Sequence, residues 1–356
     1  MAIVTMKLRG RTIRPHKASI HPTFASRTVL TNEPWQFVTL ALKRQRQRAA
    51  LFFWEQARTF HIAAEGLPLE SAPLLLYYSF MNAAKALLSA RGVAFDNRHG
   101  VTEWKTGITG RDSLKTVGVE IKNAGILPAL SGYYQETESH RKHTLQELFF
   151  NMPFIHRTYC LTYKTQTEMF VPLVNCRFLC DRDTDRAYFG AKLSRDYSSL
   201  RIVKRLPPSL IADGKPPAPE PSEPPSGPPI RSATDAACTR PFRPSQATTD
   251  AITSLHQQLR TDLFYINGTQ TLWYAKTKVA GPRRLARQCP TLALAAMHRL
   301  SELSRYQPMA LAAYLSGPQN WLLSEFITMS PAQFIDEVAS EITGHEFLVP
   351  NVRAAT

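Results

Sequence analysis

The sequence predicts an α+β protein that is mainly α, with a helical core and a β-rich insert. Two observations carry this prediction. Apolar residues recur at three- and four-residue steps over residues 32–163 and again over 282–345, which is the period of amphipathic helices. Between these regions, runs rich in β-branched and aromatic residues are separated by turn-forming residues, a pattern typical of hairpins. The 356 residues, 44% of them hydrophobic, suffice for one large or two ordinary domains.

The chain begins with a basic segment, residues 1–31, that Pro15 and Pro22 interrupt and that has no clean period. We expect an arm or short strands there. From Asn32, a long amphipathic helix is expected through about Ala64. Its outer face is basic, and this face is either a solvated charged surface or a contact surface for a partner. The basic residues are Lys43, Arg44, Arg46 and Arg48.

The next helix, expected from about Ala72 to Arg91, is so apolar that it must be mostly buried. Ser71 suits its N-cap, Pro73 fits its first turn, and Gly92 can take the left-handed conformation that ends a helix. A single polar strip runs along it, formed by Ser79, Asn82, Lys85 and Ser89. A buried lysine needs a partner, because an unpaired buried charge is very costly. The strip is therefore expected to face a cleft or an internal polar network.

The elements after this helix are expected in a definite order. Residues 93–110 form a loop, 114–121 a strand or short helix, and 125–134 a turn-rich segment. Helical spacing returns over residues 144–163, where Pro153 must kink or split the helix. Together, residues 32–164 make the first helical region.

The insert spans residues 165–281 and is expected to start with a hairpin formed by 168–182 and 187–204. Residues 207–245 are rich in proline and poor in large apolar residues, so they are expected as an exposed loop. A second hairpin is expected around Asn267-Gly268. Helices resume over residues 282–356, where Ser330-Pro331 starts the last helix and Gly344 ends it.

Several runs resemble known families. The run YYSFMNAAKALLSARG (residues 77–92), followed by His99-Gly100, resembles the second-helix signature of HEPN-like proteins and, more closely, the YaaC-like family. LSELSRYQP (300–308), Trp321 and FLVPNV (347–352) resemble further YaaC-like elements. The resemblance implies that the N- and C-terminal helices pack into one HEPN-like helical core.

The charge favours an anionic partner. The net charge is +15, and residues 1–66 hold 11 Lys and Arg against 3 Glu. A field of this sign attracts nucleic acid, whether RNA or DNA, or an acidic protein partner; the alternative is a soluble protein that is merely basic. The residues expected to bind nucleic acid are Lys43, Arg44, Arg46 and Arg48, and in a second basic cluster Arg283, Arg284 and Arg287.

Other classes are disfavoured by what the sequence lacks. Five cysteines without a CxxC pair make neither a disulfide framework nor a zinc ribbon, so no metal is expected. The sequence has no P-loop and no GxGxxG after a strand, and no cofactor is expected. No apolar run reaches 18 residues and no N-terminal apolar leader is visible, so a cytoplasmic protein without a membrane segment is expected.

The resemblance also suggests a chemistry. Catalytic HEPN ribonucleases use an arginine and a histidine separated by four to six residues, usually across a dimer interface. Here, only Arg9 or Arg11 with His16 and Arg14 with His21 match, and these lie in the proline-broken segment. Arg91 and His99 are separated by seven residues, outside the pattern.

The candidate catalytic group is therefore His99 for proton transfer, Lys85 or Arg91 to offset phosphate charge, and Asn82 to orient one of them. The competing interpretation makes His99 a residue that ties a loop to the helix. Tyr77 is expected as a core aromatic with a hydroxyl partner, His298 as a hydrogen-bonded core histidine, and Arg305 as either a family element or a helix-end arginine.

Two functions remain open at this level. One is a HEPN-like subunit of a bacterial defence or toxin-type system that binds nucleic acid or an acidic protein, non-catalytic or dependent on a partner. The other is a divergent metal-independent endoribonuclease that uses His99. A homodimer or hetero-complex is implied by the resemblance alone.

Overall fold

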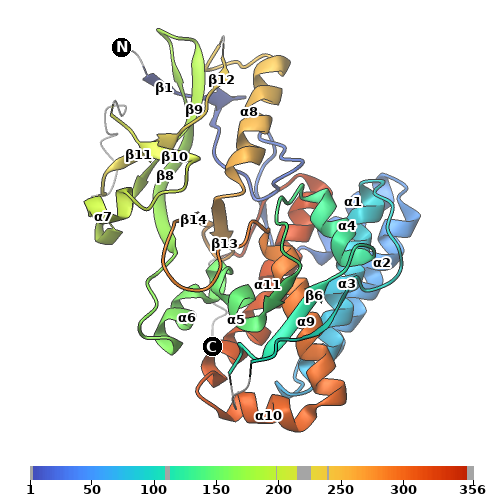
Figure 1. Ribbon diagram of the computed structural model, residues 1–356. Coiled ribbons are helices and arrows are strands. Elements are labelled where there is room, and N and C mark those ends of the chain that lie inside the picture. The colour runs from blue at the N-terminus through green and yellow to red at the C-terminus, as the bar shows by residue number, and fades with distance from the viewer. Residues whose placement is uncertain (1–2, 109–112, 198, 215–225, 239, 351–356) are drawn as a thin grey trace, which may run out of the picture. The chain divides into compact units, whose positions relative to one another are not determined.

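The computed structural model describes residues 3–108, 113–197, 199–214, 226–238 and 240–350 (Figure 1). The chain is divided into two compact units. A strand-rich unit is drawn from Met1–Leu30, Glu168–Val279 and Gly344–Thr356, and a helical unit from Thr31–Thr167 and Ala280–Thr343. The mixed α+β class predicted from the sequence is confirmed.

The helical unit is built around α3 (Ala72–Ala90), whose bounds match the predicted helix closely. Gly92 has a φ of 66° just after its end, as expected, whereas the Ser71 side chain makes no capping hydrogen bond. α3 contacts α2, α9 and α11, and the ring of Phe80 stacks on that of Phe334 in α11, with centroids 4.1 Å apart. Full burial of one such side chain stabilises the fold by about 1.5–3 kcal/mol. The principal helices around α3 are α1 (Trp35–Arg44), α2 (Arg48–Ala64), α9 (Cys289–Tyr306), α10 (Pro308–Ser316) and α11 (Asn320–Thr343).

A three-stranded antiparallel sheet, ordered β5-β6-β7, follows α3 in the same unit. Thr144 ends β7 and caps α5 through a reciprocal capping box with Glu147. Pro153 splits the predicted helix over 144–163, which confirms that expectation. The elements are β5 (Val101–Lys105), β6 (Val117–Ile121), α4 (Ile126–Tyr133), β7 (Lys142–Thr144), α5 (Leu145–Phe150), a 3-10 turn (Pro153–Ile155) and α6 (His156–Thr162).

The strand-rich unit contains an antiparallel sheet ordered β10-β11-β9-β8-β14-β13, with β1 added to β8 and β12 to β9. Both predicted hairpins are present, as β8–β9 and β13–β14. The rings of Phe178 and Phe189 lie in its buried core, and α8 adds Ile252, Leu255 and Leu259. The strands are β1 (Ile3–Thr5), β2 (Lys7–Leu8), β3 (Arg11–Thr12), β4 (Val29–Leu30), β8 (Phe170–Asp181), β9 (Arg186–Leu193), β10 (Leu210–Ala212), β11 (Pro229–Ser232), β12 (Ala236–Ala237), β13 (Leu263–Ile266), β14 (Leu272–Lys276) and β15 (Phe347–Leu348); the helices are α7 (Leu200–Val203), α8 (Gln246–Leu259) and a 3-10 turn (Arg195–Tyr197).

Four expectations about helices and loops were wrong. The single helix over residues 32–64 is broken between α1 and α2, because Arg46 has a φ of 57°, which no right-handed helix can continue. The expected loop over 93–110 contains β5, and the expected turn-rich segment over 125–134 is α4. The last helix does not start at Ser330-Pro331, since α11 runs through Pro331 without a break.

The proline-rich segment over residues 207–245 is not only a loop. Strands β10, β11 and β12 lie within it, while residues 215–225 and 239 are outside the described residues. The helix α8 was not predicted at all. In the second hairpin, Ile266 pairs with Leu272, so Asn267 and Gly268 lie in a loop over residues 267–271, and neither is among the described residues with positive φ. The two-residue turn that Asn-Gly often forms is therefore not present.

Candidate functional site

The polar strip of α3 does not face one environment. The hydroxyl of Ser79 is fully buried and donates to the carbonyl of Ala57 in α2 at 2.9 Å. The amide of Asn82 donates to the carbonyl of Tyr78 one turn earlier, at 2.8 Å. Lys85 is half-buried, and its ammonium lies 5.3 Å from the centre of the Phe53 ring. No carboxylate pairs with Lys85 within the described residues, so its charge is available to a ligand.

The loop that carries His99 is held by two glycines that touch. Gly100 has a φ of 76° and Gly125 a φ of 128°, both in the region that only glycine occupies without strain. A Cβ on Gly100 would lie 2.3 Å from Cδ of Pro128, and one on Gly125 would lie 2.5 Å from Cα of Gly100. This close approach fixes the backbone immediately after His99.

The start of α4 fixes the same loop by hydrogen bonds. The backbone N–H of Ile126 donates to the carbonyl of Arg98 at 2.9 Å, and that of Leu127 donates to the carbonyl of His99 at 3.2 Å. These N–H groups belong to the first turn of a helix, where they have no partner inside the helix. His99 is thus an exposed side chain on a well-anchored backbone.

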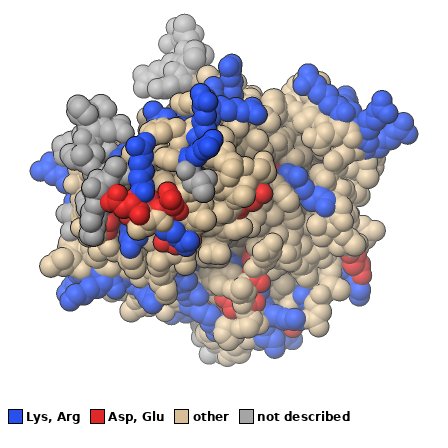
Figure 2. All heavy atoms as spheres, turned by 90° about the horizontal axis from the view of Figure 1, so that it is seen from above, with Lys and Arg blue, Asp and Glu red and all other residues tan. Residues whose placement is uncertain are grey.

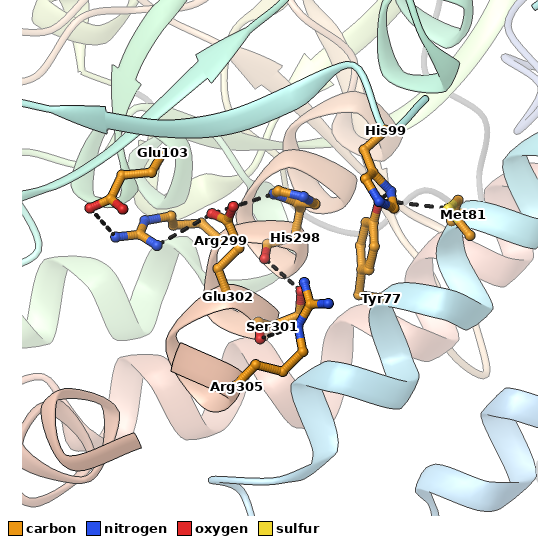
Figure 3. A network of polar contacts seen from close by, with 9 residues as sticks. All are labelled: Tyr77, Met81, His99, Glu103, His298, Arg299, Ser301, Glu302 and Arg305. Atoms are coloured by element: carbon orange, nitrogen blue, oxygen red, sulfur yellow. Dashed lines mark hydrogen bonds and ion pairs between the residues drawn. The ribbon is translucent and has the colours of Figure 1, made fainter. Parts of the chain in front are cut away.

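Tyr77 holds the imidazole of His99 from below (Figure 3). Its hydroxyl oxygen lies 2.5 Å from Nδ1 of His99 and donates to Sδ of Met81 at 3.6 Å. The tautomer of His99 sets the direction of the Tyr77 contact: when Nδ1 carries the proton, the hydroxyl accepts it and the lone pair of His99 lies on Nε2. Nε2 makes no hydrogen bond to any described residue. Tyr77 is only 1% exposed, and burial raises its pKa, so it remains a neutral phenol.

Helix α9 brings two further groups to these rings. His298 is buried and packs edge-on against Tyr77 with ring centroids 4.8 Å apart, and its ring centroid is 5.5 Å from that of His99. Arg305, in the last turn of α9, points its guanidinium toward the same rings (Figure 3). Its Nε donates weakly to the carbonyl of Ser301 at 3.4 Å. Its other nitrogens make no hydrogen bond in the described part of the chain, and its guanidinium carbon lies 5.0 Å from the centre of the Tyr306 ring.

Burial and nearby cations keep both histidines neutral. Partial burial lowers the pKa of His99, and the charges of Arg305 and Lys85 lower it further. The pKa of His298 falls to about 3, mainly through burial and then through His99, Arg305 and Arg299. His99 is therefore a neutral proton acceptor at pH 7, while His298 can serve neither as an acid nor as a cation.

The acidic residues near the site are paired with a different arginine. Arg299 donates to Glu103 at 2.8 Å and to Glu302 at 3.3 Å (Figure 3). Oε2 of Glu302 lies 3.7 Å from Nδ1 of His298, which is too long for a hydrogen bond. Arg299 brings one positive charge to these two carboxylates, and the charge of Arg305 also acts to lower the pKa of Glu302, against the raising effect of burial, although the two side chains form no ion pair.

The structure places the other expected catalytic residue, Arg91, away from this group. Its guanidinium donates to the carbonyl oxygens of Glu341 and Ile342, the latter at 3.3 Å. Arg91 therefore ties the end of α3 to the end of α11. Of the other candidates, Lys85 is close enough to His99 for its charge to lower the pKa of His99, whereas Asn82 donates to a carbonyl of its own helix.

The residues expected to bind nucleic acid fall into two kinds. Arg287 is buried and forms an ion pair with the buried Glu136 at 3.0 Å, so it stabilises the interior. Arg283 is exposed and Arg284 is half-buried. The exposed cations at the α1–α2 junction are Lys43, Arg44, Arg46 and Arg48. All of them except Arg44 line a hollow of about 370 Å³. Figure 2 shows that Lys and Arg are widespread on one face of the molecule and that Asp and Glu are sparse.

Sequence reasoning found His99 and Lys85 but did not connect them with Tyr77, His298 and Arg305. The sequence signal for this connection was that the run with Tyr77 and the run with Arg305, residues 77–92 and 300–308, both resemble the YaaC-like family. No cluster of three or more His, Cys, Asp or Glu able to hold a metal ion occurs among the described residues. Within the same residues, no helix combines the length and apolar character needed to cross a bilayer.

Comparison with known proteins identifies a family. The family described as YaaC-like Protein matches residues 20–342, nearly the whole chain. No curated protein and no solved structure matches significantly.

Proposed function

We propose a function for this chain, which belongs to the YaaC-like family. It binds RNA, with one backbone phosphate held by Arg305, Lys85 and His99. The observation that carries this proposal is that the charges of Arg305 and Lys85 both act on the neutral imidazole of His99, with no carboxylate in an ion pair with either cation among the described residues. Arginine and lysine are the side chains that hold phosphate in most complexes of this kind.

The exposed cations of the α1–α2 junction support the same proposal. Lys43, Arg44, Arg46 and Arg48 belong to the same helical unit, and their side chains are not paired with carboxylates in the described residues. They would contact further phosphates without reading sequence. Binding should therefore weaken steeply as the salt concentration rises, because each neutralised phosphate releases counterions.

A filter-binding titration with single-stranded RNA and DNA, at two salt concentrations, tests the proposal. Loss of one charge-assisted hydrogen bond of about 1.5–3 kcal/mol predicts roughly 10- to 100-fold weaker RNA binding for Arg305→Gln. Lys115→Gln is the matched control, because Lys115 is exposed and far from His99 along the β5–β6 hairpin. Lys115 lies in the connection between the two strands, whereas His99 precedes the opposite end of β5. Absence of RNA binding at low salt would reject the proposal and leave an acidic protein as the partner.

A second function, metal-independent RNA cleavage, is favoured by one specific observation. The fold supplies an arginine, Arg305, beside the histidine that had no arginine at the expected spacing. Nε2 of neutral His99 would take the proton of a 2′-hydroxyl, whose oxygen attacks the adjacent phosphorus. The O2′–P bond forms, the P–O5′ bond breaks, and the products are a 2′,3′-cyclic phosphate and a 5′-hydroxyl. Arg305 and Lys85 would offset the added charge on the phosphate oxygens.

Within the described residues, the site offers one proton acceptor, and the two rings packed against it cannot protonate the leaving oxygen. The low pKa of His298 keeps it unprotonated, and the raised pKa of Tyr77 keeps its proton in place. Water or a group from a partner would have to supply that proton. We therefore propose that cleavage, where it occurs, depends on a partner, either a second copy or another subunit. The cellular setting implied by the HEPN-like resemblance is a bacterial defence or toxin-type system.

Incubation of the full chain with structured RNA in the presence of a chelator tests the second function. Loss of a general base should slow cleavage by about 10²–10⁴-fold in His99→Ala. Tyr77→Phe should reduce the rate less, because it removes only the hydrogen bond that orients the ring. Cleavage that persists in His99→Ala would show that another residue is the base, and no cleavage with any partner would leave RNA binding alone.

A further inference from the structure

We infer a second ligand site, in the strand-rich unit, that binds a phosphate-bearing molecule of mononucleotide size. The unit contains a cleft of about 690 Å³. Small-molecule sites usually occupy about 300–1,000 Å³. The cleft belongs to neither the His99 site nor the α1–α2 surface, so the inference is independent of the RNA proposal.

Two arginines give the cleft its positive charge. Arg14 follows β3, and Arg177 lies on β8. Arg14 is exposed, and among the described residues no hydrogen bond or ion pair occupies its guanidinium. One carboxylate, Glu346, also lines the cleft, but it accepts the backbone N–H of Lys17 at 3.2 Å. The lining is thus positive overall, and the planar guanidinium suits bidentate binding of phosphate.

A β-bulge forms part of the same wall. The pairing of β8 with β9 shifts register between Val174 and Arg177, and Asn175 within the bulge has a φ of 56°. Bulges re-aim side chains and are common beside ligand sites. Nδ2 of Asn175 is buried and has no hydrogen-bond acceptor within the described chain. A phosphate oxygen would supply one; the smaller cavity that Asn175 and Arg177 also border, about 20 Å³, has room only for water.

Part of the remaining lining is apolar. Leu173 and Trp273 are cross-strand neighbours in β8 and β14, and both border the cleft. Trp273 is 8% exposed, so only a small part of its side chain is available. A ligand with a phosphate at one end and a ring at the other matches this combination of cations and apolar surface. A nucleoside monophosphate is the simplest molecule of that kind.

Isothermal titration of the full chain with AMP, adenosine, inorganic phosphate and succinate tests the site. AMP should bind saturably at one site per chain, adenosine at least tenfold more weakly, and succinate not measurably. Arg14→Gln should weaken AMP at least tenfold, and Arg14→Lys should lose less. The control is Arg11→Gln, an exposed arginine of the same short hairpin that does not line the cleft. A His99→Ala, Arg305→Gln double variant should bind AMP normally.

Several results would overturn the inference. AMP and phosphate that both fail to bind at millimolar concentration would remove the site, and succinate that binds as well as AMP would remove the phosphate assignment. Equal losses in Arg14→Gln and Arg11→Gln would indicate diffuse charge attraction. Loss of AMP binding in the double variant would move the ligand to the His99 site. Unchanged near-ultraviolet circular dichroism in Arg14→Gln would establish that the fold is intact.

Discussion

The anchoring of His99 by two touching glycines predicts a large cost for one methyl group. Gly100→Ala adds two penalties to the folded state. An alanine held at positive φ costs about 1–2 kcal/mol. Its Cβ would also lie 2.3 Å from Cδ of Pro128 and 3.1 Å from Cα of Gly125. Forcing extra volume into a packed contact costs about 1–3 kcal/mol. The free energy of unfolding of the helical unit should therefore fall by about 2–5 kcal/mol.

Gly92→Ala separates the two penalties. Gly92 also has a positive φ, 66°, but nothing lies within 4 Å of a Cβ built there. Gly92→Ala should incur only the first penalty, so the free energies of unfolding of the two variants should differ by about 2 kcal/mol. In a domain of 150–250 residues this corresponds to a difference of about 4–8 °C in Tm. Urea and thermal unfolding of both full-length variants, followed by far-ultraviolet circular dichroism, measure the difference.

Equal losses in Gly100→Ala and Gly92→Ala would refute the reasoning, because they would mean that the loop moves aside at no cost and that His99 is not anchored. Gly125→Ala gives an independent check, since its Cβ would lie 2.5 Å from the backbone of Gly100. The Gly100→Ala, Gly125→Ala double variant should lose less stability than the sum of the losses in the single variants, because both added methyl groups strain the same contact.

Three further predictions follow from buried polar groups. The folded-state pKa of His298, about 3, lies below the usual 6.5, so the stability that neutral His298 contributes is present above pH 6.5 and is lost as the pH falls toward 3. The free energy of unfolding in urea should therefore fall between pH 7 and pH 5, and this fall should be about 2 kcal/mol smaller in His298→Phe. Glu136→Gln should lower stability by about 3–5 kcal/mol by leaving Arg287 buried and unpaired, and Arg287→Met in that background should recover part of the loss, as chemical denaturation would measure. Arg91→Met should lower Tm through lost bonds to the last turn of α11 yet leave RNA affinity in filter binding unchanged.

The parts of the fold that the sequence predicted well are those with local signals. The bounds of α3 follow from the apolar period, Pro73 in the first turn and Gly92 after the end. The two hairpins follow from β-rich runs separated by turn residues. In each case the signal and the structure involve the same short stretch, so no distant contact is needed.

The break between α1 and α2 has no local signal. The run KRQRQR consists of good helix formers. The break lets α1 fold back on α2, where Trp35 packs on Trp54 with ring centroids 4.5 Å apart and Nε1 of Trp54 donates to the Trp35 carbonyl at 3.0 Å. Burial of two tryptophans outweighs the cost of about 1–3 kcal/mol for a positive φ at Arg46. Tertiary packing therefore overrides helix propensity here.

The proline-rich segment failed for a different reason. Proline composition argues against central strands, but a proline is tolerated as the first residue of a strand. Pro229 stands in that position in β11, which pairs with both β9 and β10. Composition averaged over 207–245 hid three short strands, β10, β11 and β12, that all add to the same sheet.

The candidate site illustrates the limit of spacing rules. A search for arginine and histidine four to six residues apart examines only pairs that one turn or loop can bring together. In this protein the partners of His99 come from Tyr77, 22 residues before it, and from Arg305, on a helix near the other end of the chain. The pairing exists because α3 and α9 pack side by side, which places Tyr77 and His298 edge to edge and directs Arg305 toward the same rings. The chemistry of the site is therefore a property of the α3–α9 contact, and a change that separates these helices should abolish the function of His99 even where every polar residue is kept.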